Sequence, residues 1–378
     1  MNLKEHEFVV FGVEHYNPLG VIRSLGEYGI QPVAIVIKGG PRLTSKSKYL
    51  KKVFYVDSRD DGLKILINTY SNKKNKTFVY SCDDITATYL DQHYEELQDN
   101  FYFFNAGKTG RLSEFLNKET IGALAEKNGL NFLQARVVKN GIVPDELTYP
   151  VITKAIDSTV GGWKNDMYIC KNREELNEAY KHILSPTVMI QKYIVKKNEY
   201  CLEGFSCNKG NDIFISIEST YNYNLPKSYS PYMTVNNFSN RSNILPALRA
   251  MFKEIGFEGI FEVEFLESES GVLYFGEINF RNSTWSYAST CAGMNLPVLW
   301  AKSMVEGRLI NGCYKEIGQS GFTAVVELTD FKERVLNRHY SIIKWIRDVK
   351  RCKCKYYLAK GDLKPVLIMA LDRVLRRS

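Results

Sequence analysis

Residues 259–281, which decide the fold, read Gly-Ile-Phe-Glu-Val-Glu-Phe-Leu-Glu-Ser-Glu-Ser-Gly-Val-Leu-Tyr-Phe-Gly-Glu-Ile-Asn-Phe-Arg. Apolar and polar residues alternate on both sides of Ser270-Gly271. This alternation is typical of two antiparallel strands, each with one buried face, joined by a tight turn. We therefore expect a β-hairpin with a two-residue turn centred on Ser270-Gly271.

A hairpin in this register brings polar side chains face to face. Glu264 falls opposite Glu277, and Glu262 falls opposite Asn279. Because side chains alternate between the two faces of a strand, Arg281 shares their face. Two opposed carboxylates lie about 5 Å apart and repel each other unless a cation lies between them. Such oxygen ligands suit Mg²⁺, and the arginine could stabilise a phosphoryl group during transfer. The alternative is the solvated outer face of an amphipathic hairpin.

The first hundred residues alternate short apolar runs with amphipathic stretches. This pattern predicts a parallel sheet with helices on both faces. Strands are expected at 8–13, 32–37, 53–56 and 77–81, and a helix at 85–97. The acids of Glu14–Pro18 and Asp83-Asp84 follow two of these strands, at the edge where open α/β sheets bind ligands. They could hold an amine, or they could be ordinary turn and cap residues.

The next two hundred residues mix helices with longer strands. Helices are expected at 113–128, 174–184 and 244–255, and strands at 150–155, 187–193, 199–207 and 212–220. The segment 221–239 is rich in Tyr, Asn, Ser and Pro. It is expected to be a long loop, either a lid or a surface excursion.

Composition narrows the class of protein. The chain is 44% apolar and 24% charged, as in ordinary globular proteins, and no apolar run is long enough to span a membrane. The eight cysteines form no CxxC pair, so neither a zinc site nor a disulfide scaffold is predicted. We expect a cytoplasmic protein.

The charge is concentrated at the C-terminus. Residues 344–378 contain eleven Lys or Arg and three Asp, which accounts for the whole net charge of +8. Because the rest of the chain is neutral and shows no DNA or RNA motif, no nucleic-acid partner is predicted. The basic, aromatic and apolar tail could lie on the inner face of an anionic membrane, or it could pack on the body with a solvated basic edge.

Several weak motifs in a fixed order resemble the ATP-grasp superfamily over about residues 8–305. The run Glu277-Ile-Asn-Phe-Arg281, with an acid on the neighbouring strand, resembles that family's metal-binding end. Ser81-Cys-Asp-Asp84 and the helix after it resemble the N-terminal domain of the D-aspartate ligase and carbamoyl-phosphate-synthase-like carboxylate–amine ligases. The resemblance implies an α/β chain: a Rossmann-like parallel-sheet domain, then a two-lobed ATP-grasp with mostly antiparallel sheets.

The same resemblance implies domain boundaries and site residues. The domains are 1–110, an ATP-grasp domain at 111–310 (small lobe about 140–192, large lobe about 193–310) and a basic extension at 311–378. The nucleotide-binding positions are Lys118, Lys154, the glycine loop with Gly161 and Gly162, the hinge Gln191, Lys192, Tyr193 and Ile194, and the ribose acid Glu199. The metal ligands are Glu264, Glu277 and Asn279, and the catalytic residues are Arg281 and Lys154. Many relatives have Glu in place of Gln191 and Asp in place of Glu264.

The resemblance implies an ATP-dependent ligase with Mg²⁺, which Mn²⁺ could replace. It would join a carboxylate to an amine, an amino acid by first guess, through an acyl-phosphate. A cell-envelope or polysaccharide-linked substrate and a homo-oligomer stay open. The alternatives are a catalytically silent nucleotide-binding or scaffold protein, and a carboxylase or carbamoyl-phosphate enzyme of the same fold.

Overall fold

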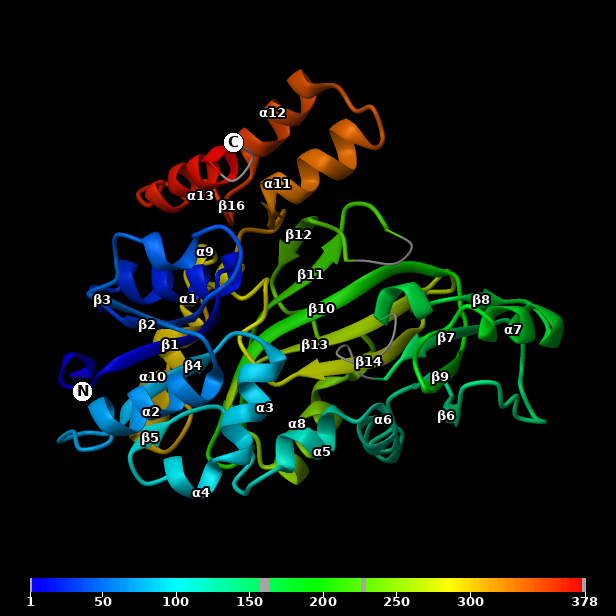
Figure 1. Ribbon diagram of the computed structural model, residues 1–378, viewed down its shortest axis with the longest axis horizontal. Coiled ribbons are helices and arrows are strands. Elements are labelled where there is room, and N and C mark those ends of the chain that lie inside the picture. The colour runs from blue at the N-terminus through cyan, green and yellow to red at the C-terminus, as the bar shows by residue number, and fades with distance from the viewer. Residues whose placement is uncertain (1, 157–162, 226–228, 376–378) are drawn as a thin grey trace.

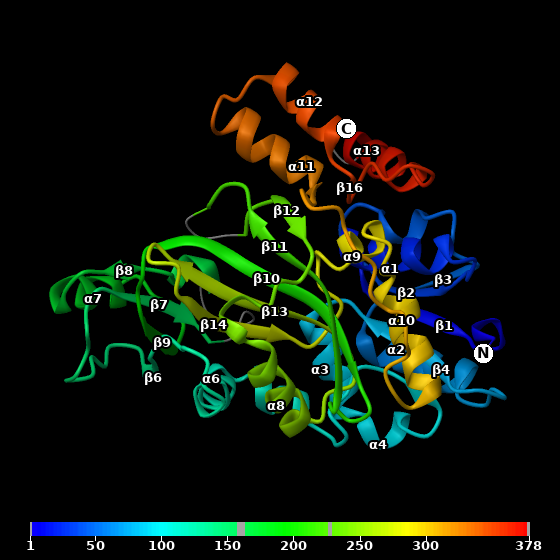
Figure 2. The same ribbon diagram turned by 180° about the vertical axis from the view of Figure 1, so that it is seen from behind.

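The computed structural model describes residues 2–156, 163–225 and 229–375. The glycine loop with Gly161 and Gly162 lies outside these residues. The described strands form three sheets, of five, seven and four strands (Figure 1). The five-stranded sheet and the four-stranded sheet lie at opposite ends of the long axis, with the seven-stranded sheet between them (Figures 1 and 2).

The five-stranded sheet is parallel throughout, with the order β3-β2-β1-β4-β5. Its strands are β1 (Phe8–Val13), β2 (Val33–Ile37), β3 (Lys52–Val56), β4 (Thr77–Ser81) and β5 (Phe101–Tyr102). The helices of this region are η1 (Leu3–Glu5), α1 (Tyr16–Glu27), η2 (Thr44–Lys46), α2 (Arg59–Tyr70), α3 (Asp84–Gln92) and α4 (Tyr94–Leu97). The predicted parallel sheet is confirmed, with the first four strands within one residue of their expected bounds.

Strand β1 shows why helices must cover both faces of this sheet. Val9 and Phe11 pack in one core with Leu66 of α2. Val10 belongs to the main core with Leu19 of α1. Because alternate side chains of a strand point to opposite faces, a strand that is apolar throughout is stable only between two layers.

The seven-stranded sheet has the order β14-β13-β10-β11-β12-β15-β16 and is antiparallel except for its last pair. Its strands are β10 (Lys196–Cys207), β11 (Asp212–Tyr221), β12 (Tyr232–Asn236), β13 (Gly259–Ser268), β14 (Leu273–Asn279), β15 (Phe322–Val325) and β16 (Cys354–Lys355). The helices near it are η4 (Arg241–Asn243), α8 (Leu245–Ile255), α9 (Tyr287–Cys291) and α10 (Leu296–Glu306). Strand β12 pairs with β11 and β15, so the prediction of a structureless loop at 221–239 is wrong for these residues.

The four-stranded sheet is antiparallel, with the order β6-β9-β7-β8. Its elements are β6 (Ala135–Lys139), β7 (Val151–Ala155), η3 (Trp163–Asp166), β8 (Ile169–Cys170), α7 (Arg173–Tyr180) and β9 (Thr187–Lys192). It has its own small core, which includes Leu176 of α7 and Val188 of β9. A parallel N-terminal sheet followed by two mostly antiparallel sheets is the fold class that the sequence predicts.

Two expected helices are each split in two. The helix expected at 113–128 consists of α5 (Arg111–Leu116) and α6 (Lys118–Lys127). Asn117 between them has φ −66° and ψ 124°, and its side chain accepts hydrogen bonds from two backbone N–H groups of α6. An asparagine that caps a new helix in this way must leave the helical conformation itself. The helix expected at 85–97 divides at His93 into α3 and α4.

The C-terminal segment contacts both the seven-stranded sheet and the region of the five-stranded sheet. Strands β15 and β16 come from the extension expected at 311–378, and they join the seven-stranded sheet. The remaining helices are α11 (Glu327–Asp330), the π-helix η5 (Phe331–Leu336), α12 (Ile342–Arg351) and α13 (Lys364–Leu375). Within the described residues, no helix combines the length and apolar character that a bilayer span requires.

A buried arginine joins this segment to the N-terminal sheet. Arg23 of α1 is 1% exposed and donates through Nε to Asp362 Oδ2 at 3.1 Å. Its Nη1 and Nη2 atoms donate to the carbonyl oxygens of Tyr356, at 2.6 Å, and of Asp362, at 2.9 Å. A buried carboxylate without its cation is costly. We infer that this contact fixes α13 against the N-terminal sheet.

Replacing Arg23 should therefore destabilise the protein strongly. Arg23→Met leaves Asp362 buried without a cation and should cost about 3–5 kcal/mol. Lys38→Met is the control, because the Lys38–Asp57 pair is exposed and should contribute less than about 1 kcal/mol. Urea unfolding followed by tryptophan fluorescence measures both. Equal midpoints for the two variants would contradict the anchoring role.

Candidate active site

The two cross-strand pairs predicted from the sequence are present. Glu262 lies opposite Asn279 and Glu264 lies opposite Glu277, on β13 and β14. Asn279 Nδ2 donates to Glu262 Oε2 at 3.0 Å and to Glu264 Oε1 at 2.9 Å. Arg281 Nη2 donates to Asn279 Oδ1 at 3.0 Å. One amide therefore links two carboxylates to the guanidinium, on the face that the sequence predicts.

The loop of the hairpin differs from the predicted turn, although the pairing of these residues is as predicted. Residues 269–271 form the loop, with Gly271 at φ +81°, instead of a two-residue turn. This change alone would shift the pairing by one residue. A bulge between Glu264 and Phe265 absorbs the shift. Gly276 permits the close approach of the strands there, because a Cβ at this position would lie 2.9 Å from the Glu264 carbonyl oxygen.

The carboxylates are crowded. Burial, together with the nearby charges of Glu262 and Glu277, raises the pKa of Glu264 well above its usual value. Burial and the neighbouring Glu203 do the same to the pKa of Glu262. One buried oxygen, Glu262 Oε1, has no hydrogen-bond partner among the described residues. The site therefore favours an added positive charge, although no cluster of three or more His, Cys, Asp or Glu arranged to hold a metal occurs in the described part of the chain.

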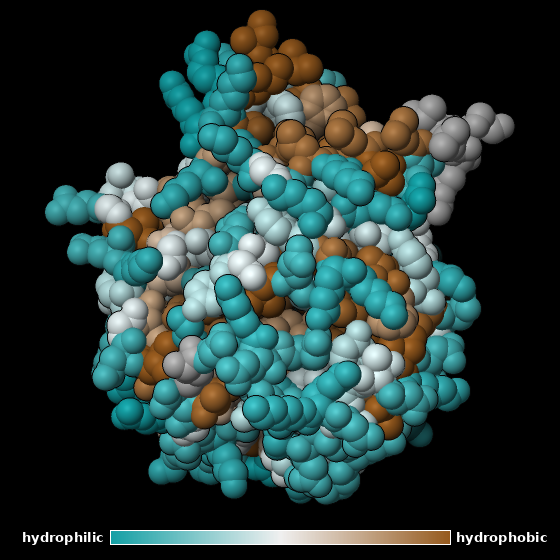
Figure 3. Space-filling view, turned by 90° about the vertical axis from the view of Figure 1, so that its left-hand side faces the viewer, coloured by the Kyte–Doolittle hydropathy of each residue, from teal (hydrophilic) through white to brown (hydrophobic). Residues whose placement is uncertain are grey.

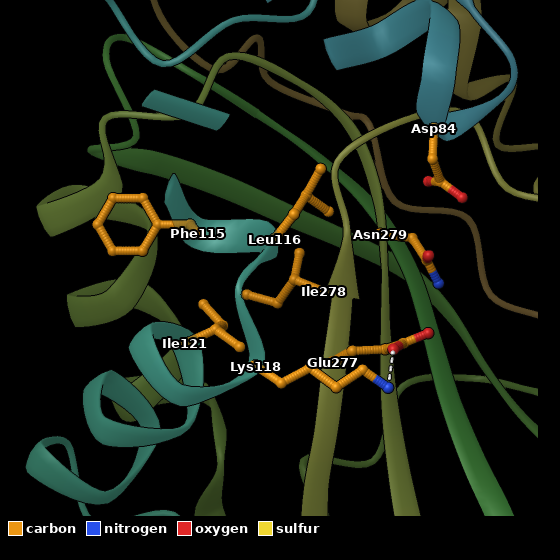
Figure 4. Close-up of a pocket in the computed structure, with 8 residues that line it drawn as sticks. All are labelled: Asp84, Phe115, Leu116, Lys118, Ile121, Glu277, Ile278 and Asn279. Atoms are coloured by element: carbon orange, nitrogen blue, oxygen red, sulfur yellow. Dashed lines mark ion pairs between the residues drawn. The ribbon is translucent and has the colours of Figure 1, made fainter. Parts of the chain in front are cut away.

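Two lysines from different elements approach these acids. Lys118 is the first residue of α6, and its Nζ atom lies 3.4 Å from Glu277 Oε2 (Figure 4). This lysine is the main cause that lowers the pKa of Glu277. Both side chains line a cavity of about 110 Å³, together with Asp84, Phe115, Leu116, Ile121, Ile278 and Asn279. The cap at Asn117 places Lys118 in the lining of this cavity.

The second lysine belongs to the four-stranded sheet. Lys154 on β7 donates through Nζ to Gln191 Oε1 at 2.8 Å. Burial, aided by the positive charge of Lys118, lowers the pKa of Lys154 to about 8. Glu277 and Glu199 act on its pKa in the opposite direction. Charged residues of four elements, α6, β7, β10 and β14, therefore act on one another in this site.

The expected hinge connects the two antiparallel sheets. Strand β9 ends at Lys192 and β10 begins at Lys196, so residues 193–195, which include Tyr193 and Ile194, pass from one sheet to the other. Gln191 Nε2 donates to the Leu133 carbonyl oxygen at 3.1 Å, which fixes the side chain at the start of the hinge.

Glu199, expected to bind ribose, accepts a hydrogen bond from Lys196 on the same strand. Contacts and charge interactions link eight of the expected site residues: Lys118, Lys154, Gln191, Glu199, Glu264, Glu277, Asn279 and Arg281. Lys192, Tyr193 and Ile194 lie at the connection between the sheets, and Gly161 and Gly162 lie outside the described residues.

The N-terminal sheet contributes a partner that the sequence did not predict. Asp84, at the start of α3, accepts a hydrogen bond from Arg281 Nε at 2.7 Å. The two residues are 197 positions apart, so no local pattern could indicate the contact. Asp83 next to it caps α3 and pairs with Arg59 at 3.0 Å, which fits the alternative of a cap residue. Glu14 accepts from the backbone N–H of Leu43 at 2.7 Å.

Buried Glu203 was also absent from the predicted site. It accepts hydrogen bonds from Ser283 and Ser286, and burial raises its pKa to about 7. It lies on β10 opposite Glu262 of β13. A regular alternation of faces along β10 could have indicated it, because Glu199 and Glu203 are four residues apart on one strand.

Comparison with known proteins places this geometry in context. No protein-family model matches the chain. A curated relative, the 2-oxoglutarate carboxylase small subunit of Hydrogenobacter thermophilus, is 24% identical over 300 residues, which is 69% of this chain. The chain spans 58% of that relative's length. The biotin carboxylase domain of the same organism's 2-oxoglutarate carboxylase, solved with MgADP and bicarbonate, is 20% identical with a TM-score of 0.56 and covers 80% of this chain and 70% of that one.

Two further solved structures are similar over more of their length. The N5-carboxyaminoimidazole synthetase of Staphylococcus aureus, complexed with ADP, is 16% identical with a TM-score of 0.66, covering 89% of this chain and 88% of that one. An L-amino acid ligase of Bacillus licheniformis is 12% identical with a TM-score of 0.61, covering 81% and 77%. At these identities the likeness concerns the fold. The chain therefore shares the fold of these solved structures, which is the fold that the resemblance in its sequence implies.

Proposed function

We propose that this protein is an ATP-dependent ligase that joins a carboxylate to an amine. The observation that carries the proposal is the convergence of two lysines and two glutamates from separate elements. Lys118 and Glu277 line one cavity. The charge of Glu277 also acts on Lys154 and Glu264. Isolated lysines or glutamates on a surface would signify little. Two cations facing opposed carboxylates form the environment that a nucleotide polyphosphate and a divalent cation require together.

The residues present suit ATP and Mg²⁺. Glu264, Glu277 and the amide oxygen of Asn279 would hold the metal, since crowding raises the pKa of Glu264 and a buried oxygen of Glu262 lacks a partner. The bound Mg²⁺, which Mn²⁺ could replace, would neutralise charge on the phosphate oxygens.

Nucleotide binding would involve both lobes. Lys118 and Lys154 would contact phosphates, the glycine loop at Gly161 and Gly162 would cover them, and Glu199 would accept from the ribose. Gln191, Lys192, Tyr193 and Ile194 would border the adenine, because they end β9 and begin the passage between the two sheets.

The chemistry is a phosphoryl transfer followed by an acyl transfer. A substrate carboxylate oxygen attacks the γ-phosphorus, the bond to ADP breaks, and an acyl-phosphate forms. An amine nitrogen then attacks the acyl carbon, phosphate leaves, and the amine loses a proton. Arg281, which Asp84 and Asn279 hold in place, would donate to the acyl-phosphate oxygens. Positioning and charge stabilisation suffice for both steps.

The substrates belong to this proposal as well. An amino acid as the amine agrees with the likeness to an L-amino acid ligase. Three further proposals do not follow from the catalytic residues. They are a carboxylate linked to the cell envelope or to a polysaccharide, a peripheral membrane contact of residues 344–378, and a homo-oligomer. A carboxylase of the same fold is the second candidate, favoured by the curated carboxylase relative.

Removing one opposed carboxylate should abolish ATP turnover. Glu277→Ala deletes the partner of Lys118 and a metal ligand, so ADP release should fall at least about a hundredfold while circular dichroism stays unchanged. Glu254→Ala is the matched control, because Glu254 pairs with Lys127 at 2.8 Å on the exposed surface. Near-normal ADP release from folded Glu277→Ala would refute the metal assignment.

A substrate panel distinguishes the candidate functions. ADP release is measured with Mg²⁺ and pairs of D- or L-amino acids with simple carboxylates, and separately with bicarbonate. We expect one amine–acid pair to stimulate release and to yield an amide product detectable by mass spectrometry. Stimulation by bicarbonate alone would favour the carboxylase, and nucleotide binding without turnover would favour a silent binding protein.

Nucleotide binding should take up a proton near pH 8. About half of Lys154 is neutral there, because its pKa is about 8, and phosphate contacts favour its charged form. Isothermal titration with ADP and EDTA, in buffers of different ionisation enthalpy, should show about half a proton taken up at pH 8, where the terminal phosphate of ADP is already ionised. Lys154→Arg stays charged and should bind without uptake. Equal uptake by both proteins would contradict the role of Lys154.

A further inference from the structure

The C-terminal helices α12 and α13 stand together at one edge of the molecule, above the parallel sheet and the end of the seven-stranded sheet (Figures 1 and 2). Each helix has an inward side that packs on the body. In α13 the buried residues are Pro365, Met369 and Asp372, and in α12 the buried residue is Val349. A surface helix normally presents polar residues on its other side.

The outer side of α13 is apolar instead. Leu363, which precedes the helix, and Leu367 and Leu371 within it are 49%, 63% and 57% exposed. They are spaced four residues apart, so they lie in one row along the helix. No described side chain covers this row, and apolar residues in such an arrangement mark an interaction surface.

Helix α12 continues the apolar surface. Ile342, Ile343 and Ile346 are 51%, 69% and 43% exposed, and Leu336 of η5 is 58% exposed. Of the nineteen exposed large apolar side chains in the described residues, nine lie between 328 and 371, so they are concentrated rather than scattered. Figure 3 shows apolar side chains gathered over the top of the molecule, with hydrophilic ones around them.

The charges on these helices are of one sign. Each acid of the basic tail is paired with an arginine from outside it: Asp348 with Arg334, Asp362 with Arg23 and Asp372 with Arg42. The cations of α12 itself have no ion pair among the described residues: Lys344, Arg347, Lys350 and Arg351. The fold thus neutralises the acids internally and leaves the positive charges at the surface.

A second copy of the chain fits this surface poorly. A twofold interface places a surface patch against itself, so the cations of one copy would meet those of the other. A nucleic acid would satisfy the cations but would leave the leucines and isoleucines in water. A bilayer with anionic headgroups matches both features, because acyl chains accept the apolar side chains while headgroups face the cations.

We propose that α12 and α13 form a docking surface for an anionic lipid bilayer, with Ile342, Ile343, Ile346, Leu363, Leu367 and Leu371 entering the headgroup boundary. This inference is independent of the proposed catalytic activity, since it rests on residues outside the active site. The Arg23–Asp362 and Arg42–Asp372 pairs hold α13 on the N-terminal sheet, and the Arg334–Asp348 pair holds α12 to η5.

Sedimentation of the full chain with vesicles tests the proposal. The protein should pellet with phosphatidylcholine vesicles containing phosphatidylglycerol, and at least about tenfold less with phosphatidylcholine alone or in high salt. Ile343→Ser combined with Leu367→Ser should lower binding at least about tenfold. Leu184→Ser combined with Ile142→Ser is the control, because these side chains are 74% and 52% exposed in the four-stranded sheet region.

A pair of charge-reversal variants distinguishes electrostatic attraction to the vesicles from nonspecific apolar adsorption. Arg347→Glu with Arg351→Glu should lower binding to the anionic vesicles at least about tenfold. Arg249→Glu with Lys253→Glu is the control, because these cations have the same spacing on α8. It should leave binding to the anionic vesicles unchanged.

Three outcomes would overturn the proposal. These are equal losses in the test and control pairs, equal pelleting with both kinds of vesicle, and a dimer in analytical ultracentrifugation that Ile343→Ser with Leu367→Ser dissociates. All variants lie outside the catalytic residues, so ATP turnover without lipid should match the unaltered protein.

Discussion

The opposition of Glu264 and Glu277 across β13 and β14 is the constraint on which the rest of the site depends. Opposed carboxylates destabilise a sheet unless positive charge offsets their repulsion. The chain supplies part of that charge from distant segments, Lys118 at the start of α6 and Lys154 on β7, and part from Arg281, which follows β14 directly. The position of α6, and hence the cap at Asn117, is therefore tied to the hairpin by charge as well as by packing.

The sequence predicted the parts of this arrangement that follow from local periodicity. The turn expected at Ser270-Gly271 placed Glu264 opposite Glu277. The loop has one more residue than expected, but the pairing holds because the bulge at Gly276 compensates for it. The same reasoning could not foresee Asn117 as a helix cap, since apolar spacing continues through it. The Arg281–Asp84 contact could not be predicted from local patterns, because contacts between distant residues depend on how whole sheets pack.

The C-terminal segment illustrates the same limit. Its composition predicted a basic extension, yet two of its strands complete the seven-stranded sheet. Only the three-dimensional structure shows that Asp348, Asp362 and Asp372 all find arginines elsewhere in the chain. In a charge count these acids offset part of the positive charge of the tail. In the fold they pair with arginines outside the tail and hold it on the body. The surface that remains is more basic than the sequence total suggests.

The charged groups of the active site share one property: each already has a partner within the chain. Lys118 pairs with Glu277, Lys154 donates to Gln191, and Arg281 pairs with Asp84. Burying an unpaired charge is costly, so a site for highly charged ligands is stable only if its groups can be satisfied internally. A polyphosphate with its cation would exchange partners with these residues, the phosphates taking the lysines and the metal taking the carboxylates. Such an exchange would leave these groups with a partner both with and without the ligand, so opposed acids and buried lysines can coexist in a stable fold.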